Sequence, residues 1–127
     1  MKYIKLILLF SLILTIECKA QQAQVNIDTE IIGTWVSEDD PKIKLVFNSD
    51  GQCLEYYDSV LSDTFSYSIS NQCEEELDVN TWFLKMIDSE DLDEYCYELY
   101  GANYDNNNTL SMRFMGNGKI YVYNKVN

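Results

Sequence analysis

The sequence predicts an all-β protein whose fold is an eight-stranded antiparallel up-and-down β-barrel. Short apolar and aromatic runs recur along the chain with turn residues between them, and no long stretch carries the apolar stripe of an amphipathic helix. The segment Thr64–Ser70 alternates strictly between polar and apolar residues, which is the pattern of a half-buried strand. Short strands at regular spacing are typical of a sandwich or a barrel. Successive hairpins favour the barrel, because closure leaves no exposed strand edge.

The expected strands follow one another with no sign of a second domain. Asp50-Gly51 between two apolar runs is a strong hairpin signal, and Gly116-Asn117-Gly118 is expected to turn the final hairpin. Residues 71–80 are expected to form an acidic connection, and residues 103–108 a polar loop. The eight expected strands are Ile31–Ser37, Lys42–Phe47, Gln52–Tyr57, Thr64–Ser70, Thr81–Ile87, Glu94–Tyr100, Leu110–Phe114 and Lys119–Asn124.

The N-terminal residues 1–20 have the composition of an export signal peptide. A short basic start precedes the apolar segment Leu6–Ile16, which is too short to span a bilayer comfortably, and Cys18-Lys19-Ala20 supplies an acceptable cleavage site. An uncleaved anchor and lipidation of Cys18 are the alternatives, although Glu17 is an unusual neighbour for a lipidated cysteine. We expect a signal peptide at 1–20, a flexible lead-in at 21–29 and a domain at 30–127. The expected location is secreted or periplasmic, with a membrane-anchored lipoprotein as the alternative.

The charge balance argues against two classes of partner, nucleic acid and anionic membrane. The formal net charge is −12, and removal of residues 1–20 makes it more negative. Binding to nucleic acid or to an anionic membrane requires basic residues that neutralise phosphate. We therefore expect a soluble protein with no nucleic-acid partner. We also expect a monomer with no membrane span. Ten tyrosines and five phenylalanines argue against disorder despite the charge.

Three cysteines follow the expected cleavage site: Cys53, Cys73 and Cys96. An exported protein normally forms disulfides, so the odd number leaves one thiol over. Metal binding is the weaker interpretation, because the chain has no histidine and no Cys-x-x-Cys pair.

Gly33-Thr34-Trp35 lies on the first expected strand of an eight-stranded exported chain that ends in the aromatic-rich run Lys119–Lys125. This combination resembles the Gly-x-Trp signature of the small exported bacterial lipocalin-like proteins of the calycin superfamily, over roughly residues 30–125. The resemblance implies that Trp35 plugs one end of the barrel beside Gly33. It also implies that a basic residue from late in the chain packs over the tryptophan ring, with Lys125 the first candidate and Arg113 the second.

The segments Phe65–Ser70 and Glu94–Leu99, together with Cys73, also look like this group. The resemblance implies a Cys73–Cys96 disulfide that leaves Cys53 free. The chain lacks the outer helix and the long loops of the large lipocalins, which argues against a deep ligand cavity.

Aromatic residues on the expected strands are the candidate ligand-binding set. An eight-stranded barrel is just wide enough to be filled by side chains or to hold one small ligand, and tyrosines could stack on such a ligand and offer it hydroxyls. For each single residue the alternative is a packing role in the core or on the outer face. The candidates are Tyr56, Phe65, Tyr67, Trp82, Tyr95, Tyr97, Tyr121 and Tyr123, with Phe114 beside them.

The expected function is therefore binding of a small apolar or aromatic molecule in the barrel interior, toward the open end opposite Trp35. The alternative is a protein-binding, polysaccharide-binding or structural accessory module. That module would act through its acidic outer face and the loops Asp88–Glu94 and Asn103–Thr109.

Catalysis and metal binding have little support in the sequence. There is no histidine to act as a general base, and nothing places a base beside Cys53. The carboxylate run Asp88–Glu94 lacks the glycine and the distal glutamate of an EF-hand loop, so a solvated turn is the better interpretation, as it is for Glu74–Glu76. We expect no enzyme activity, no cofactor and no metal.

Overall fold

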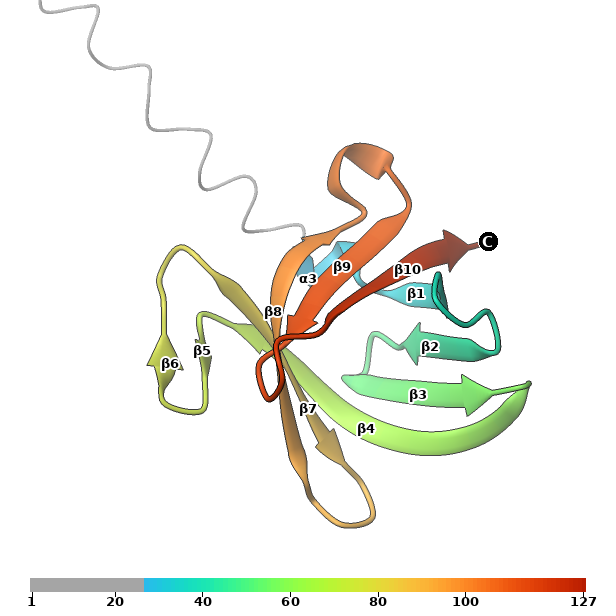
Figure 1. Ribbon diagram of the computed structural model, residues 1–127, viewed down its shortest axis with the longest axis horizontal. Coiled ribbons are helices and arrows are strands. Elements are labelled where there is room, and N and C mark those ends of the chain that lie inside the picture. Colours follow the sequence, from blue (N-terminus) through green and yellow to red (C-terminus); the bar gives the residue numbers. More distant parts are fainter. Residues whose placement is uncertain (1–26) are drawn as a thin grey trace, which may run out of the picture.

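The computed structural model describes residues 27–127, in which eight antiparallel strands close into a barrel (Figure 1). Each barrel strand pairs with its neighbour in the chain, and the last pairs with the first, so the predicted fold class is confirmed. The expected signal peptide, Cys18 and most of the expected lead-in lie outside the described residues. The barrel strands are β1 (Gly33–Ser37), β2 (Ile43–Phe47), β3 (Gln52–Tyr57), β4 (Val60–Ser70), β7 (Trp82–Asp88), β8 (Glu94–Ala102), β9 (Thr109–Phe114) and β10 (Ile120–Val126).

A single helical turn, α3 (Ile27–Glu30), precedes the barrel. Ile27 packs against the barrel core, and the backbone N–H of Ile31 donates to the Ile27 carbonyl at 3.1 Å. Ile31 is fully buried between this turn and β1. Strand β1 therefore begins at Gly33 and not at the expected Ile31, which instead anchors the segment that leads into the strand.

Two connections differ from the sequence-based expectation. Strand β4 begins at Val60, earlier than the expected Thr64, because Asp58 (φ 49°) and Ser59 (φ 68°) form a tight turn. Positive φ at both central residues is the geometry of a type I′ two-residue hairpin turn. Residues within the expected acidic connection form a small hairpin of β5 (Gln72–Cys73) and β6 (Glu76–Leu77), which lies outside the barrel. The polar loop before β9 contains a 3₁₀ turn, η1 (Tyr104–Asn106).

The core fills the inside of the barrel with alternate residues of its strands. The barrel has two ends, the closed end and the mouth. The closed end is the end at which β1 begins and β2 finishes. The mouth is the end at which β7 finishes and β8 begins. Alternation places every second side chain of a strand on the same face. The most deeply buried inward side chains are those of Trp35, Leu45, Phe47, Cys53, Leu84, Leu110 and Met112.

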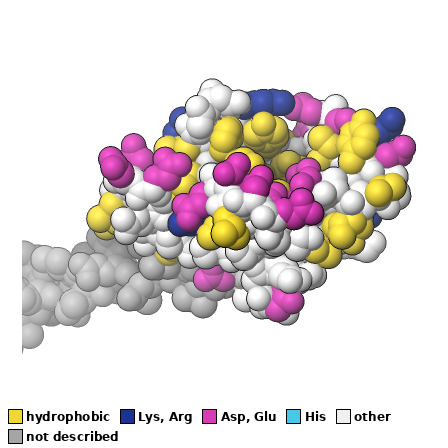
Figure 2. Space-filling model, turned by 90° about the horizontal axis from the view of Figure 1, so that it is seen from below, with side chains coloured by type: hydrophobic (Ala, Val, Ile, Leu, Met, Phe, Trp, Pro, Cys, Tyr) yellow, Lys and Arg dark blue, Asp and Glu magenta, His cyan; other side chains and the backbone are white. Residues whose placement is uncertain are grey.

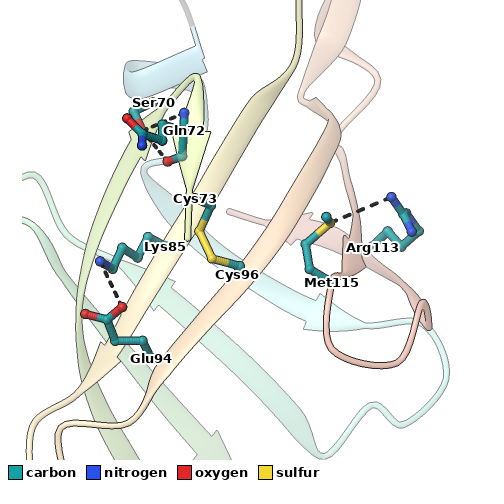
Figure 3. The surroundings of a disulfide bond; sticks show 8 residues. All are labelled: Ser70, Gln72, Cys73, Lys85, Glu94, Cys96, Arg113 and Met115. Atoms are coloured by element: carbon teal, nitrogen blue, oxygen red, sulfur yellow. Dashed lines mark hydrogen bonds and ion pairs between the residues drawn. A yellow bond between two sulfur atoms is a disulfide. The ribbon is translucent and has the colours of Figure 1, made fainter. Parts of the chain in front are cut away.

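A disulfide on the outside of the barrel fixes the β5–β6 hairpin. Cys73 of β5 is bonded to Cys96 of β8, with a Cα–Cα distance of 6.0 Å (Figure 3). Phe83 packs against the pair. The implied pairing is confirmed, and Cys53 is the free, buried cysteine. No helix within residues 27–127 is long and apolar enough to cross a membrane.

Candidate functional site

The closed end is built around Trp35, whose side chain has no exposed surface. Its indole Nε1 donates a hydrogen bond to the Ile31 carbonyl at 2.7 Å. The Nζ of Lys125 lies 5.1 Å from the centre of the indole ring and donates to the Glu30 carbonyl at 3.2 Å. Arg113, the second candidate, instead forms an ion pair with Glu98, its register partner across β8 and β9.

Gly33 has a physical role in this arrangement. Its φ of +135° lies in a region that residues with a side chain rarely adopt, and a Cβ there would approach the Cε of Lys125 to 2.9 Å. The absence of a side chain at position 33 therefore lets the Lys125 stem cross β1 on its way to the Trp35 ring. The Gly-x-Trp motif thus serves the architecture of the closed end.

The mouth contains a cavity of about 250 Å³. Figure 1 shows the β7–β8 turn at the bottom of the view, and Figure 2, seen from below, shows acidic and hydrophobic side chains gathered around a hollow. Every barrel strand except β1 contributes to the lining, and β4, β7 and β8 each contribute two successive inward residues. The apolar and aromatic lining consists of Leu45, Phe65, Met86, Tyr95, Tyr97, Met112 and Tyr123.

Three carboxylates also line the cavity: those of Glu55, Asp63 and Asp88. Glu55 and Asp63 are register partners on β3 and β4. Asp88 ends β7 opposite Phe65 and is only 8% exposed. One of its oxygens, Oδ1, accepts a hydrogen bond from the backbone N–H of Glu90 at 2.7 Å, so the turn that follows holds this side chain in place.

The surroundings of these groups change their acidities. Burial raises the pKa of Glu55, the neighbouring charge of Asp63 raises it further, and a hydrogen bond from Ser62 opposes the shift. Burial also raises the pKa of Tyr97 and of Tyr123, so both phenols keep their protons at neutral pH.

Tyr123 is the most enclosed polar side chain of the lining. It is 6% exposed, yet its hydroxyl makes no hydrogen bond to any group of residues 27–127. A buried hydroxyl normally has a partner. Because every fully enclosed polar atom in this part of the chain has one, the Tyr123 oxygen must be reachable from the cavity.

The predicted aromatic residues divide between several places. Phe65, Tyr95, Tyr97 and Tyr123 line the mouth cavity. Around them, the ring of Tyr97 lies 5.3 Å from that of Phe114 and 6.4 Å from that of Tyr121.

The other three predicted ligand residues lie away from the mouth. Tyr67 packs edge-to-face on Phe47 and donates to the Asn48 carbonyl at 2.7 Å, toward the closed end. Tyr56 is the register partner of Lys44, whose Nζ lies 4.7 Å from its ring centre, and its side chain does not join the core. Trp82 lines a separate groove.

That groove, of about 510 Å³, lies between α3 and the η1 segment that joins β8 to β9. It is larger than the mouth cavity and borders Ile27, where the described chain begins. Two polar side chains of this groove are hydrogen-bonded to each other: Asn103 Nδ2 donates to Glu30 Oε2. The mouth is the better candidate, since the Tyr123 hydroxyl in its lining has no hydrogen-bond partner within residues 27–127.

The three cavity carboxylates are functional candidates that the sequence-based prediction missed. Glu55 lies two residues after the buried Cys53, so strand alternation places it inside. Asp63 falls on the same face as Phe65 once β4 starts at Val60. Asp88 continues the inward series of Leu84 and Met86, whereas the sequence assigned it to a solvated turn.

Two kinds of reactive site come into question in the described residues, a metal centre and the free cysteine. No group of three or more acidic or cysteine side chains within residues 27–127 is arranged to hold a metal ion. Cys53 is fully buried, and burial strongly raises the pKa of its thiol, which keeps it in the unreactive protonated form.

Comparisons with protein-family models, with curated proteins and with solved structures find no match for this chain.

Proposed function

We propose that this protein is an exported lipocalin-like binding protein that holds a small molecule in the mouth of its barrel. The observation that carries the proposal is the mouth cavity, which is walled by aromatic residues and contains the unpaired hydroxyl of Tyr123. Ligand sites combine apolar walls with a few convergent polar groups. The mouth has this composition.

The size of the cavity indicates a small ligand. Its volume of about 250 Å³ lies just below the roughly 300–1,000 Å³ that is usual for small-molecule sites. Leu45 and Met112, each 2% exposed, form an apolar floor that would bury the body of the ligand.

The exported, lipocalin-like part of the proposal rests on the closed end and on the disulfide. Gly33, Trp35 and Lys125 meet as the resemblance implies, in a closed eight-stranded barrel. The Cys73–Cys96 disulfide supports an oxidising compartment, since disulfides are rare in the cytosol.

Native mass spectrometry of protein purified from its own host tests the proposal by detecting a retained small molecule. Asp63→Trp would place a large ring in the mouth, whereas Ser66→Trp adds the same ring to the outer, exposed face of the same strand. We expect the molecule to be lost from the Asp63→Trp protein and kept by Ser66→Trp. A xenon-pressurised crystal with no gas atom beside Leu45 and Met112 would contradict the proposal.

A second candidate is the binding of a protein or polysaccharide through the outer loops. It is favoured by two exposed hydrophobic side chains at loop tips, Leu92 (70% exposed) and Tyr104 (68% exposed). Loss of glycan-array or partner binding in Leu92→Ser or Tyr104→Ser, with Asp63→Trp unaffected, would support this alternative and reject the mouth as the site.

A further inference from the structure

The three mouth carboxylates have no basic partner, although every lysine and arginine between residues 27 and 127 has a defined contact. Lys85 and Arg113 form ion pairs with Glu94 and Glu98 on the outer face. The remaining cations lie over aromatic rings: Lys42 over Tyr57, Lys44 over Tyr56, Lys119 over Tyr121 and Lys125 over Trp35. None of these basic residues lines the mouth cavity, so its negative charge is left uncompensated.

The arrangement of the carboxylates disfavours a bare metal ion. Glu55, Asp63 and Asp88 come from three different strands, β3, β4 and β7, and line the cavity wall. Within the described residues they do not converge closely enough to form a metal-binding group. A metal ion needs several oxygens within about 2–2.6 Å, whereas an organic cation can be met by carboxylates that are farther apart.

The aromatic wall suits a cation that carries an apolar body. Tyr95 and Tyr97 lie beside the carboxylates, and their rings pack with Phe65 and Phe114. An ammonium group is attracted to the face of such rings. The Tyr123 hydroxyl adds an unpaired oxygen that can accept a hydrogen bond from an ammonium N–H.

We infer that the ligand of the mouth cavity is a small organic cation, an ammonium group on an apolar or aromatic body. The inference rests on the proposed function and specifies the ligand class of the same site. The ammonium lies near Glu55 and Asp63, where it offsets the repulsion between these register partners. The apolar body reaches the floor formed by Leu45 and Met112. Binding is non-covalent.

Three probes of similar shape and different charge test this inference by isothermal titration of the full chain: 2-phenylethylammonium, 2-phenylethanol and 3-phenylpropionate. We expect the ammonium probe to bind at least about tenfold more tightly than the alcohol, since two close carboxylates favour the charged form, and the carboxylate probe to bind most weakly. Equal binding of the ammonium and the alcohol, or no binding of the ammonium, would overturn the inference.

Charge variants separate the mouth from the overall negative field of the protein. Glu55→Gln is expected to weaken ammonium binding by about fivefold to tenfold and to leave the affinity for the alcohol nearly unchanged. Glu75→Gln removes the same charge from the exposed β5–β6 turn and is expected to change neither affinity. Equal weakening by both variants would overturn the inference, because the effect would then come from net charge.

Different experimental results would reject the proposed function and the inference about the ligand class. A neutral or anionic molecule retained in native mass spectra would leave the mouth as the binding site and reject the cation. A mouth that takes up none of the three probes and holds no xenon would reject both.

Discussion

Trp35 and Lys125 are register partners on β1 and β10, and the Lys125 ammonium lies 5.1 Å from the Trp35 ring centre. The contact joins the first strand of the barrel to the last. The indole N–H of Trp35 donates a hydrogen bond to the Ile31 carbonyl, and the ammonium of Lys125 donates one to the neighbouring Glu30 carbonyl, at the end of the α3 turn. The closed end therefore ties together the entry to the barrel, its first strand and its final strand.

Trp35→Ala is expected to lower the free energy of unfolding by about 3–5 kcal/mol, as for other large buried aromatic residues. The side chain is fully buried, so its removal leaves a cavity and an unpaired Ile31 carbonyl. Chemical denaturation measures the loss. The partly exposed Trp82 provides the matched control, and its alanine variant should cost less. A loss below about 1 kcal/mol at position 35 would show that Trp35 does not close the barrel.

Gly33→Ala is expected to destabilise the protein by about 1–3 kcal/mol, because the new Cβ meets the Lys125 stem and the backbone has positive φ. A double-mutant cycle separates the two causes. In a Lys125→Ala background the steric contact is gone, so Gly33→Ala should cost less, although the backbone strain remains. Costs that simply add would show that the Lys125 contact does not matter.

Thiol counting should find one reactive cysteine among those after residue 20, and only after unfolding, because Cys53 is buried and free while Cys73 and Cys96 are bonded. The sequence separation of 23 residues between the bonded cysteines predicts that the Cys73→Ala/Cys96→Ala double variant loses about 3 kcal/mol of stability. Cys53→Ala is the control that leaves the disulfide intact. Three reactive thiols would contradict the pairing.

The barrel was predictable because its strands obey simple alternation. Thr64–Ser70 alternates without exception, and Asp50-Gly51 directly marks the hairpin of β2 and β3. The start of β4 was not predictable in this way, since Asp58-Ser59 adopts positive φ without the glycine or asparagine that normally signals such a turn. The β5–β6 hairpin is also difficult to predict, because each of its strands is two residues long.

The candidate site was predictable only in its aromatic half. Tyr95, Tyr97 and Tyr123 fit a barrel interior by residue type and phase. Glu55, Asp63 and Asp88 lie in the same phase, but charged residues are expected to face solvent, where their hydration is kept. Their inward position becomes evident once the strands close around a hollow that solvent or a ligand can fill.

Glu55→Gln provides a pH-dependent test of the mouth. The groups that face Glu55 are Asp63, Tyr97, Tyr123 and Cys53, and none of them is cationic. Below its ordinary pKa of 4.5, Glu55 is protonated in both the folded and the unfolded chain, so burial of a charge costs nothing. As the pH rises through the raised folded pKa, the unfolded chain releases this proton more readily, and the folded protein loses stability.

Glutamine cannot ionise, so the Glu55→Gln protein should be spared this loss. We expect its urea midpoint to exceed that of the wild type increasingly as the pH rises from about 4.5 to neutrality. Glu75→Gln, in the exposed β5–β6 turn, should follow the wild type across the same range. A difference between Glu55→Gln and wild type that is constant with pH would show that the Glu55 carboxylate is fully solvated, and one that shrinks toward neutrality would show that its charged form is stabilised. Either result would contradict an enclosed mouth with uncompensated charge.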